Sequence, residues 1–324
     1  MTPLERLALT LSIIFVCPAL GYALKRASER SPRLPLFLDV WRPRLQSLAI
    51  FILMPFSATL SLWGLPRPDA SLFLLPLMGL LAYVWGGALA VLCARALGMD
   101  AASTGAFYCC GTFSNIGAVG GLICLIFLGE NAIALVALYR VLEEVFYFGA
   151  AFPAAASWAK KNGGAQGKAN FRRVYPALAA IVCALACGVW LNFAAFPRPG
   201  CLGPVASGSM LCATVILLIA IGHTLRFSSV WGFRRAALAM CLIKFGGVPL
   251  VVTSAAGFLG FGAYDNGIIL KTVAVLSAMP VAMTALVPLA LFNLNLDLAN
   301  ACWLATTLAL FPALPALVWL MPHL

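Results

Sequence analysis

Three charged side chains fall inside one strongly apolar stretch of this 324-residue sequence. Arg140, Glu143 and Glu144 belong to "AIALVALYRVLEEVFYFGAAFPAA", which is long enough to cross a membrane as a helix. Burying a charge in hydrocarbon costs several kcal/mol, so an ionisable side chain in such a segment is a candidate for function. On a continuous helix Arg140 and Glu144, four residues apart, would pair on one face, and Glu143 would lie about 100° away.

Two kinds of chemistry fit these three residues, which we take as candidate ion-coupling residues. One glutamate could bind and release a proton or help to ligate Na+, while Arg140 holds that carboxylate or meets a carboxylate of a substrate. A carboxyl group in a low-dielectric environment takes up a proton more readily than in water, which suits a reversible proton carrier. The alternative is a structural ion pair that only fixes helix packing, and the sequence leaves both open.

A second unusual feature is the segment "GTFSNIGAVGG", 111–121, which places four glycines and three polar residues inside another apolar run. Clustered glycines weaken a helix by about 1 kcal/mol each relative to alanine. The segment "SAMPVAMTALVP", 277–288, contains Pro280 and Pro288, and proline within a helix removes a hydrogen bond and clashes with the preceding turn. Since freed backbone groups cannot face lipid, such interruptions persist only beside protein or a water-filled cavity.

The elements that would hold these residues are membrane-spanning helices. The chain is 63% hydrophobic and only 10% charged, against roughly 25% charged residues in soluble domains. We therefore predict an all-α integral membrane protein with ten transmembrane helices and no separate soluble domain. The predicted spans are 7–24, 46–64, 72–96, 103–128, 132–156, 174–194, 207–224, 236–260, 268–292 and 299–320.

The formal net charge of +11 fits a membrane topology better than a nucleic-acid partner. Most lysines and arginines fall in the loops after the first, third, fifth and seventh predicted spans, and only Arg6, Arg67, Arg198 and Lys271 fall on the opposite side. Positive charges concentrate in cytoplasmic loops. Both termini are therefore expected outside the cytoplasm, in a multi-pass protein of the inner cell membrane.

The segment "AKKNGGAQGKANFRR", 159–173, is a polar, glycine-rich and charged linker between two groups of five predicted spans. We predict a first five-helix repeat at 1–158, this cytoplasmic linker, and a second repeat at 174–324. Repeats with an odd number of spans have opposite orientations, as in the inverted repeats of many secondary transporters. The two interrupted segments then lie in helices 4 and 9, where they can cross near the middle of the membrane.

Several segments resemble the auxin efflux carrier family and its bacterial members. The first is "NIGAVGG" from Asn115, followed by "LICLIFLGENAIALVALY", and the second is the ending "LSAMPVAMTALVPLALFNLNLDLANACWLATTLALFPALPALVWL". The segments "LQSLAIFILMPFSATLSL" and "IKFGGVPLVV", with Lys244 and Pro249, also fit that family. The resemblance extends over nearly the whole chain through short motifs.

This resemblance implies a fold like that of the bile acid:sodium symporters, with crossing helices 4 and 9 framing the substrate. It implies a secondary active transporter of a small organic anion, a carboxylate, that works by alternating access and is coupled to Na+ or H+. An ion-coupled symporter of a bile-acid-like or other amphipathic substrate is an alternative. A membrane-embedded enzyme or a channel is the alternative from another class, but no nucleophile, zinc or phosphate-loop motif favours an enzyme.

The resemblance also names residues at the substrate site. The motif's threonine and proline are replaced here by Ile116 and Leu122, which leaves the substrate and the coupling ion open. The candidates are Asn115, Gly117 and Gly120 in the first crossover motif, Pro280 in the second, and the hydroxyl side chains Ser114 and Thr284. Asn115 could instead form a hydrogen bond between helices.

Lys244 lies within the eighth predicted span, where it either extends toward the membrane surface or attracts an anion. The eleven cysteines show no metal-binding spacing, so no metal and no cofactor is expected beyond Na+ or H+ as a coupling ion. The expected partners are the organic anion and the lipid bilayer, with a homodimer as a further possibility and no nucleic acid.

Overall fold

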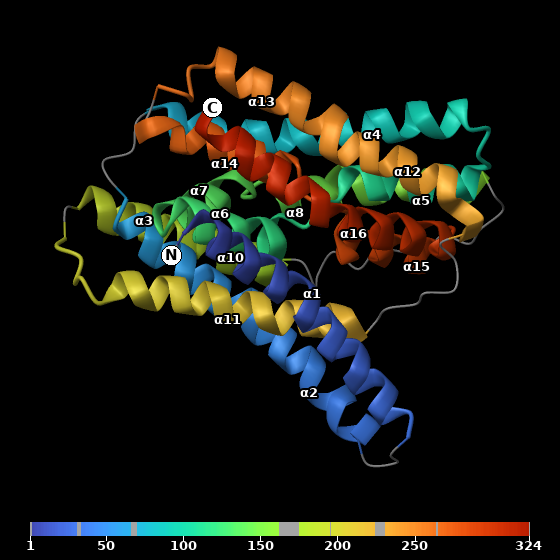
Figure 1. The fold of residues 1–324 in the computed structure, drawn as a ribbon, viewed down its shortest axis with the longest axis horizontal. Helices are drawn as coiled ribbons and strands as arrows, with labels where there is room; N and C mark the ends of the chain where they lie inside the picture. The colour runs from blue at the N-terminus through green and yellow to red at the C-terminus, as the bar shows by residue number, and fades with distance from the viewer. Residues whose placement is uncertain are drawn as a thin grey trace. The chain divides into compact units, whose positions relative to one another are not determined.

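A computed structural model describes residues 2–30, 34–65, 70–161, 175–194, 196–223, 231–263 and 265–323. Nearly all of these residues are helical (Figure 1). Within them the extended backbone forms no strand, only one isolated antiparallel pair between Ser114 and Val281. The all-α fold predicted from the sequence is confirmed.

Among the described residues, six helices are long and apolar enough to cross a membrane, as expected for a multi-pass membrane protein. Four further apolar helices are shorter, and the arrangement of ten spans in two repeats stays a prediction. The long helices are Pro3–Ser28, Val40–Trp63, Leu72–Ala96, Leu202–His223, Arg234–Phe258 and Leu296–Leu320, and the shorter ones are Ile116–Leu128, Val182–Phe193, Ile268–Ser277 and Met283–Phe292.

The chain forms two compact units, and each contains segments from both predicted repeats. The first unit comprises residues 1–69, 117–138 and 179–225, and α11 contacts α1, α2, α3 and α6 within it. The predicted linker lies largely outside the described residues, and the division into repeats at 1–158 and 174–324 stays a prediction. The helices of this unit are α1 (Pro3–Ser28), α2 (Leu34–Leu48), α3 (Met54–Trp63), α6 (Gly121–Leu128), α7 (Asn131–Tyr139), α10 (Tyr175–Phe193) and α11 (Leu202–His223).

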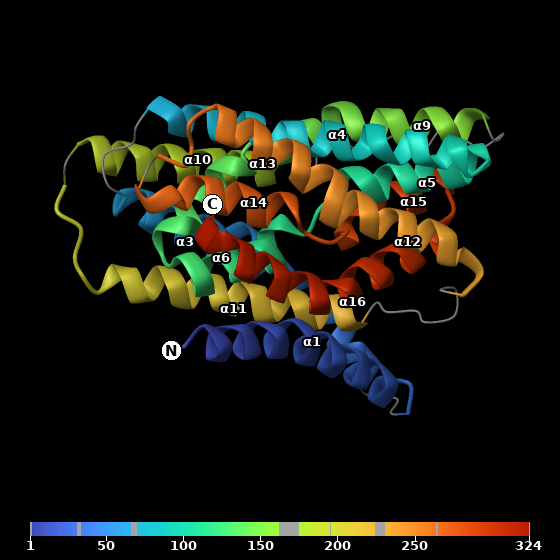
Figure 2. The ribbon, with the colours of Figure 1, turned by 45° about the horizontal axis from the view of Figure 1, so that its top comes forward.

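Helices α1 and α11 approach each other at two glycines. A Cβ added at Gly21 would lie 2.0 Å from the carbonyl oxygen of Ile219, and one added at Gly222 would lie 2.0 Å from that of Pro18. The two helices run side by side in Figure 1 and Figure 2. Small residues permit this close backbone contact between membrane helices.

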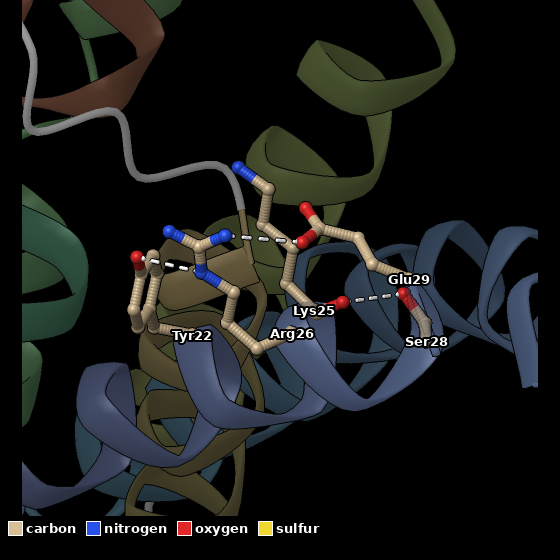
Figure 3. Close-up of polar contacts among 5 residues, drawn as sticks. All are labelled: Tyr22, Lys25, Arg26, Ser28 and Glu29. Atoms are coloured by element: carbon tan, nitrogen blue, oxygen red, sulfur yellow. Dashed lines mark hydrogen bonds and ion pairs between the residues drawn. The ribbon is translucent and has the colours of Figure 1, made fainter. Parts of the chain in front are cut away.

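The last turn of α1 carries positive charges that the sequence places after the first span. The Arg26 guanidinium donates to the Tyr22 hydroxyl at 2.9 Å and to the Glu29 carboxylate at 3.2 Å (Figure 3). The Ser28 hydroxyl donates to the carbonyl oxygen of Lys25 at 2.7 Å. Cations at a helix C-terminus interact favourably with its dipole, so Lys25 and Arg26 suit this end of the helix.

The second unit comprises residues 70–116, 139–178 and 226–324. Within it α5 packs against α4, α9 and α16, while α13 packs against α4 and α14 (Figure 2). Helix α5 is therefore enclosed by other helices of the same unit. The helices are α4 (Leu75–Ala96), α5 (Ala101–Thr112), α8 (Glu143–Phe146), α9 (Phe152–Lys161), α12 (Arg234–Leu242), α13 (Val248–Phe258), α14 (Ile268–Ser277), α15 (Leu286–Phe292) and α16 (Leu296–Leu320).

Three helical stretches contain a wide, π-helical turn directly before a proline. In each, the backbone N–H of the residue before the proline donates to the first carbonyl of the wide turn, five residues back. Proline has no N–H and its ring displaces the carbonyl four residues back, so the widened turn accommodates it without ending the helix. The turns are η1 (Ala49–Leu53) before Pro55, η4 (Tyr147–Ala151) before Pro153, and η7 (Ile243–Gly247) before Pro249.

Candidate functional site: a crossing of two interrupted helices

Both interruptions predicted from glycine and proline are present. Helix α5 ends at Thr112, Phe113 is extended with φ −85° and ψ 123°, and helical backbone resumes in the wide turn η3 (Ile116–Gly120). Helix α14 ends at Ser277, and a short 3-10 turn, η9 (Met283–Ala285), then leads into α15. Each interruption is therefore a few non-helical residues between two helical segments.

The backbones of the two interruptions are hydrogen-bonded to each other. The Asn115 N–H donates to the Pro280 carbonyl oxygen at 2.9 Å, and the Ala282 N–H donates to the Phe113 carbonyl oxygen at 3.2 Å. All four residues belong to the second unit. The predicted crossing of the interrupted segments is thus present as a short antiparallel pairing, which we call the crossing (residues 113–115 and 280–282).

Side chains from two other elements satisfy the remaining N–H groups of the crossing. The Val281 N–H donates to the Thr306 hydroxyl oxygen on α16 at 3.2 Å, and the Ser114 N–H donates to the Tyr147 hydroxyl oxygen on η4 at 3.4 Å. Unpaired backbone groups are costly in a membrane interior. These two hydroxyls therefore allow the chain to leave the helical path inside an apolar protein.

Lys244 pairs with the carbonyl end of α5. Its ammonium donates to the Gly111 carbonyl oxygen at 2.7 Å, to the Ser114 hydroxyl oxygen at 2.7 Å and to the Phe113 carbonyl oxygen at 3.2 Å. Its side chain is 1% exposed. The alternative in which Lys244 extends to the membrane surface is therefore wrong, because the side chain turns into the second unit toward the carbonyl oxygens at the end of α5.

The ion pair in the predicted fifth span is formed by Arg140 and Glu143, where the sequence favoured Arg140 and Glu144. The Arg140 Nε lies 2.7 Å from a Glu143 carboxylate oxygen, and the Glu143 side chain is the more buried of the two glutamates. The cause is a break in the helix. Between α7 and α8 the Glu143 N–H donates to the carbonyl oxygen of Arg140, so a three-residue turn replaces the four-residue register expected of a continuous helix.

A row of aromatic rings connects this ion pair with the crossing. The Tyr83 ring on α4 lies 5.3 Å from that of Tyr147, which lies 3.9 Å from that of Phe113, measured between centroids. Glu143 interacts electrostatically with both tyrosines. Tyr147 therefore contacts the crossing and also interacts electrostatically with Glu143 of the ion pair.

The structure brings some of the predicted substrate residues together and not others. Ser114, Asn115 and Pro280 meet at the crossing, where Ser114 is buried and Asn115 is half-buried. Thr284 lies on η9 and is exposed. Gly117 and Gly120 lie on η3 and belong to the first unit.

Three residues that hold the crossing were missing from the predicted site: Lys244, Thr306 and Tyr147. A charged residue in the middle of an apolar run was the available signal for Lys244. Thr306 lies in the C-terminal segment quoted for the family resemblance, which by itself does not indicate a contact with Val281. Nothing in the sequence indicated a role for Tyr147 except that it lies in the same apolar segment as Arg140 and Glu143.

Helix α5 is fixed at its other end by an N-terminal cap outside the membrane-spanning segments. An Asp100 carboxylate oxygen accepts a hydrogen bond from the Ser103 N–H at 2.7 Å. Hydrogen bonds from Ser103 lower the pKa of Asp100 below its ordinary value, because they favour the charged carboxylate. The cap and Lys244 thus hold opposite ends of the same helix.

The oxygen atoms at the crossing could hold a cation, because two carbonyls and a hydroxyl converge on one point that the Lys244 ammonium occupies. Among the described residues no three histidine, cysteine, aspartate or glutamate side chains gather as metal ligands. The sequence matches no protein-family model and none of the curated proteins. The resemblance to auxin efflux carriers therefore stays a prediction that rests on the motifs quoted above.

Proposed function

We propose that this protein is a secondary active transporter of a small organic anion, built from ten membrane spans in two inverted repeats. Transport of the anion would proceed by alternating access around the crossing and would be coupled to a gradient of Na+ or H+. The chain would lie in the inner cell membrane with both termini outside the cytoplasm. The observation that carries this proposal is the pairing of two interrupted helices in one unit, with each break held by side chains of neighbouring helices.

Interrupted helices of this kind support binding because they expose helix ends within the membrane. Helical backbone resumes at Ile116 and at Met283. In general, the N–H groups of the first turn of a helix have no carbonyl partner within that helix. Such ends carry partial positive charge and attract anions, while carbonyl ends attract cations. A carboxylate substrate and a coupling cation could therefore bind at the same crossing.

The proposal is tested by reconstituting the purified protein in liposomes. Counterflow of labelled malate, malonate and indole acetate is measured with imposed Na+ or proton gradients. We expect one of these carboxylates to be exchanged and the exchange to be lost in Asn115→Ala, because Asn115 lies at the crossing. Asn300→Ala, in the first turns of α16 and not part of the crossing, should exchange at the wild-type rate.

Three results would speak against a carrier. Downhill flux of a probe without counterflow, and without accumulation under any gradient, would indicate a channel, and chemical conversion of a labelled compound would indicate an enzyme. If wild-type protein that remains folded exchanges none of the three probes, the organic-anion proposal fails.

A further inference from the structure

The oxygen atoms around the Lys244 ammonium are arranged like those that bind a monovalent cation. Its nitrogen is in contact with two carbonyl oxygens and one hydroxyl oxygen at 2.7 to 3.2 Å, at the C-terminal end of α5. It is the one buried lysine among the side chains that the structure describes. Among those residues no carboxylate pairs with it, so helix-end carbonyls and a hydroxyl alone hold the ammonium.

These oxygens are of the type that ligates Na+ at interrupted helices in secondary transporters, where unwound carbonyls and helix C-termini coordinate the coupling ion. An ammonium group has a single positive charge and three N–H donors, which match the three oxygens in number. While Lys244 is charged and in place, its nitrogen fills the position that Na+ would take between them.

We infer that the coupling cation of this protein is a proton carried on Lys244, which takes the place of Na+ at the carbonyl end of α5. The inference rests on the proposed carrier function and narrows it to one coupling ion. The step is a simple proton transfer: the ammonium releases H+ to water on one side of the membrane and the amine takes up H+ from water on the other.

The hydrogen bonds around Lys244 can be satisfied in both protonation states. The charged ammonium donates to the Gly111 and Phe113 carbonyl oxygens and to the Ser114 hydroxyl oxygen. A neutral amine has two N–H donors and one lone pair, so it can keep both carbonyls and accept from the Ser114 hydroxyl, which rotates freely as donor or acceptor. Because the Ser114 hydroxyl can donate to the neutral amine, the proton can be released without leaving a polar atom of this buried site unpaired. A carbonyl oxygen in the place of that hydroxyl could only accept, and the lone pair of the amine would then have no donor.

The elements packed near Lys244 carry several titratable groups. The Cys110 thiol on α5 interacts electrostatically with the Lys244 ammonium. Helix α13, which packs against η7, carries no titratable residue. The titratable and charged residues of the other elements are Tyr108 and Cys109 on α5, Arg234, Arg235 and Cys241 on α12, and Tyr83, Cys93 and Arg95 on α4. The Ser114 N–H also donates to the Tyr147 hydroxyl oxygen, and Tyr147 interacts electrostatically with Glu143, which is paired with Arg140. Of these, the carboxylate of Glu143 is already paired.

The first test uses wild-type protein in liposomes, with labelled malate, malonate and indole acetate as probes. A proton gradient should drive accumulation, and a Na+ gradient at equal pH on both sides should not. Accumulation driven by Na+ alone would overturn the inference while leaving the carrier proposal intact. If folded wild-type protein exchanges none of these probes, the carrier proposal fails and the inference fails with it.

The second test uses Lys244→Arg, which keeps a positive charge and N–H donors but does not release its proton. We expect proton-driven accumulation by this variant to fall to the level of protein-free liposomes, and the exchange that it retains to be independent of a proton gradient. The pH dependence of exchange should flatten, a change that a purely structural role would not produce. Lys271→Arg is the matched control, because Lys271 donates only to a loop carbonyl, that of Asn266, and should behave as wild type.

Accumulation by Lys244→Arg at the wild-type level would overturn the inference. If that variant does not fold, a pH-sensitive dye enclosed with the wild-type protein gives the deciding result. Substrate entry without movement of protons would then contradict the role of Lys244, and entry accompanied by protons but independent of Na+ would support it.

Discussion

At the crossing, single side chains replace the backbone hydrogen bonds that are lost where the helices are interrupted. The Thr306 hydroxyl accepts from the Val281 N–H and donates to carbonyls of its own helix, so it forms hydrogen bonds with two segments of the chain at once. Thr306 has 0% exposure, and no water can take its place from the outside. A buried donor that loses its partner costs about 1–3 kcal/mol.

We therefore expect Thr306→Val to lower the free energy of unfolding by about 1–3 kcal/mol, because it keeps the side-chain volume and removes the acceptor for Val281. The measurement is thermal unfolding of the purified protein in detergent. Thr307→Val is the matched control, since the adjacent hydroxyl donates only to the Trp303 carbonyl oxygen of α16. Equal losses in the two variants would show that the contact with Val281 does not stabilise the crossing.

The Arg140–Glu143 pair shows why charges along a helix cannot be paired by spacing alone. A four-residue spacing favours Glu144, but the helix is interrupted between α7 and α8, and the carbonyl of Tyr139 lies so close to α4 that a Cβ at Gly79 would come within 2.1 Å of it. The local turn then presents Glu143 to Arg140. The pairing therefore follows the local turn, which lies where the chain packs against α4.

At the scale of the element, α5 is held at both ends by charged side chains of opposite sign. Asp100 caps its N-terminus and Lys244 its carbonyl end. Along its length α5 meets α4 at Gly86 and Gly111, where an added Cβ on either residue would lie within 2.4 Å of the other's carbonyl oxygen. The interruption is thus the end of a tightly positioned helix, not a loosely packed segment.

The cap makes the stability of α5 depend on pH. Because hydrogen bonds from Ser103 lower the pKa of Asp100 in the folded protein, its stabilisation is present above the unfolded pKa of about 3.9 and is lost as the pH falls through the folded value. Asp100→Asn keeps an oxygen acceptor but does not titrate. The difference in Tm between wild type and Asp100→Asn should therefore shrink on acidification from about pH 6 toward pH 3. A difference that stays constant with pH would contradict this account.

The sequence predicts helices and their interruptions well because both are local properties. Glycines at 111–121 and Pro280 weaken helices wherever they occur, and the breaks follow. Apolar runs locate the helices but not their ends: α2 begins at Leu34, although the predicted span begins at 46, because a helix continues past its apolar part. The partners of the breaks were not predictable in this way, since Lys244 lies more than a hundred residues from the oxygens that it contacts.

At the scale of the whole molecule, segments distant in sequence form each compact unit. The interrupted helix of the first predicted repeat supplies α5 to the second unit and α6 to the first, so the crossing stands where the chain passes from one unit to the other. In the second unit the same crossing draws on both predicted repeats, through Ser114 and Val281. Inverted repeats that interleave would produce such units.

The number of spans has a direct topological test. If ten spans cross the membrane, the loops at Gly98 and Gly129 lie on opposite sides, whereas six long helices alone would leave both loops on one side, because no long helix lies between them. Alkaline phosphatase, active only outside the cytoplasm, should be inactive when fused after Gly98 and active after Gly129 and after Leu324. Green fluorescent protein at the same positions should give the reverse pattern, and equal activity at Gly98 and Gly129 would exclude a complete fourth span.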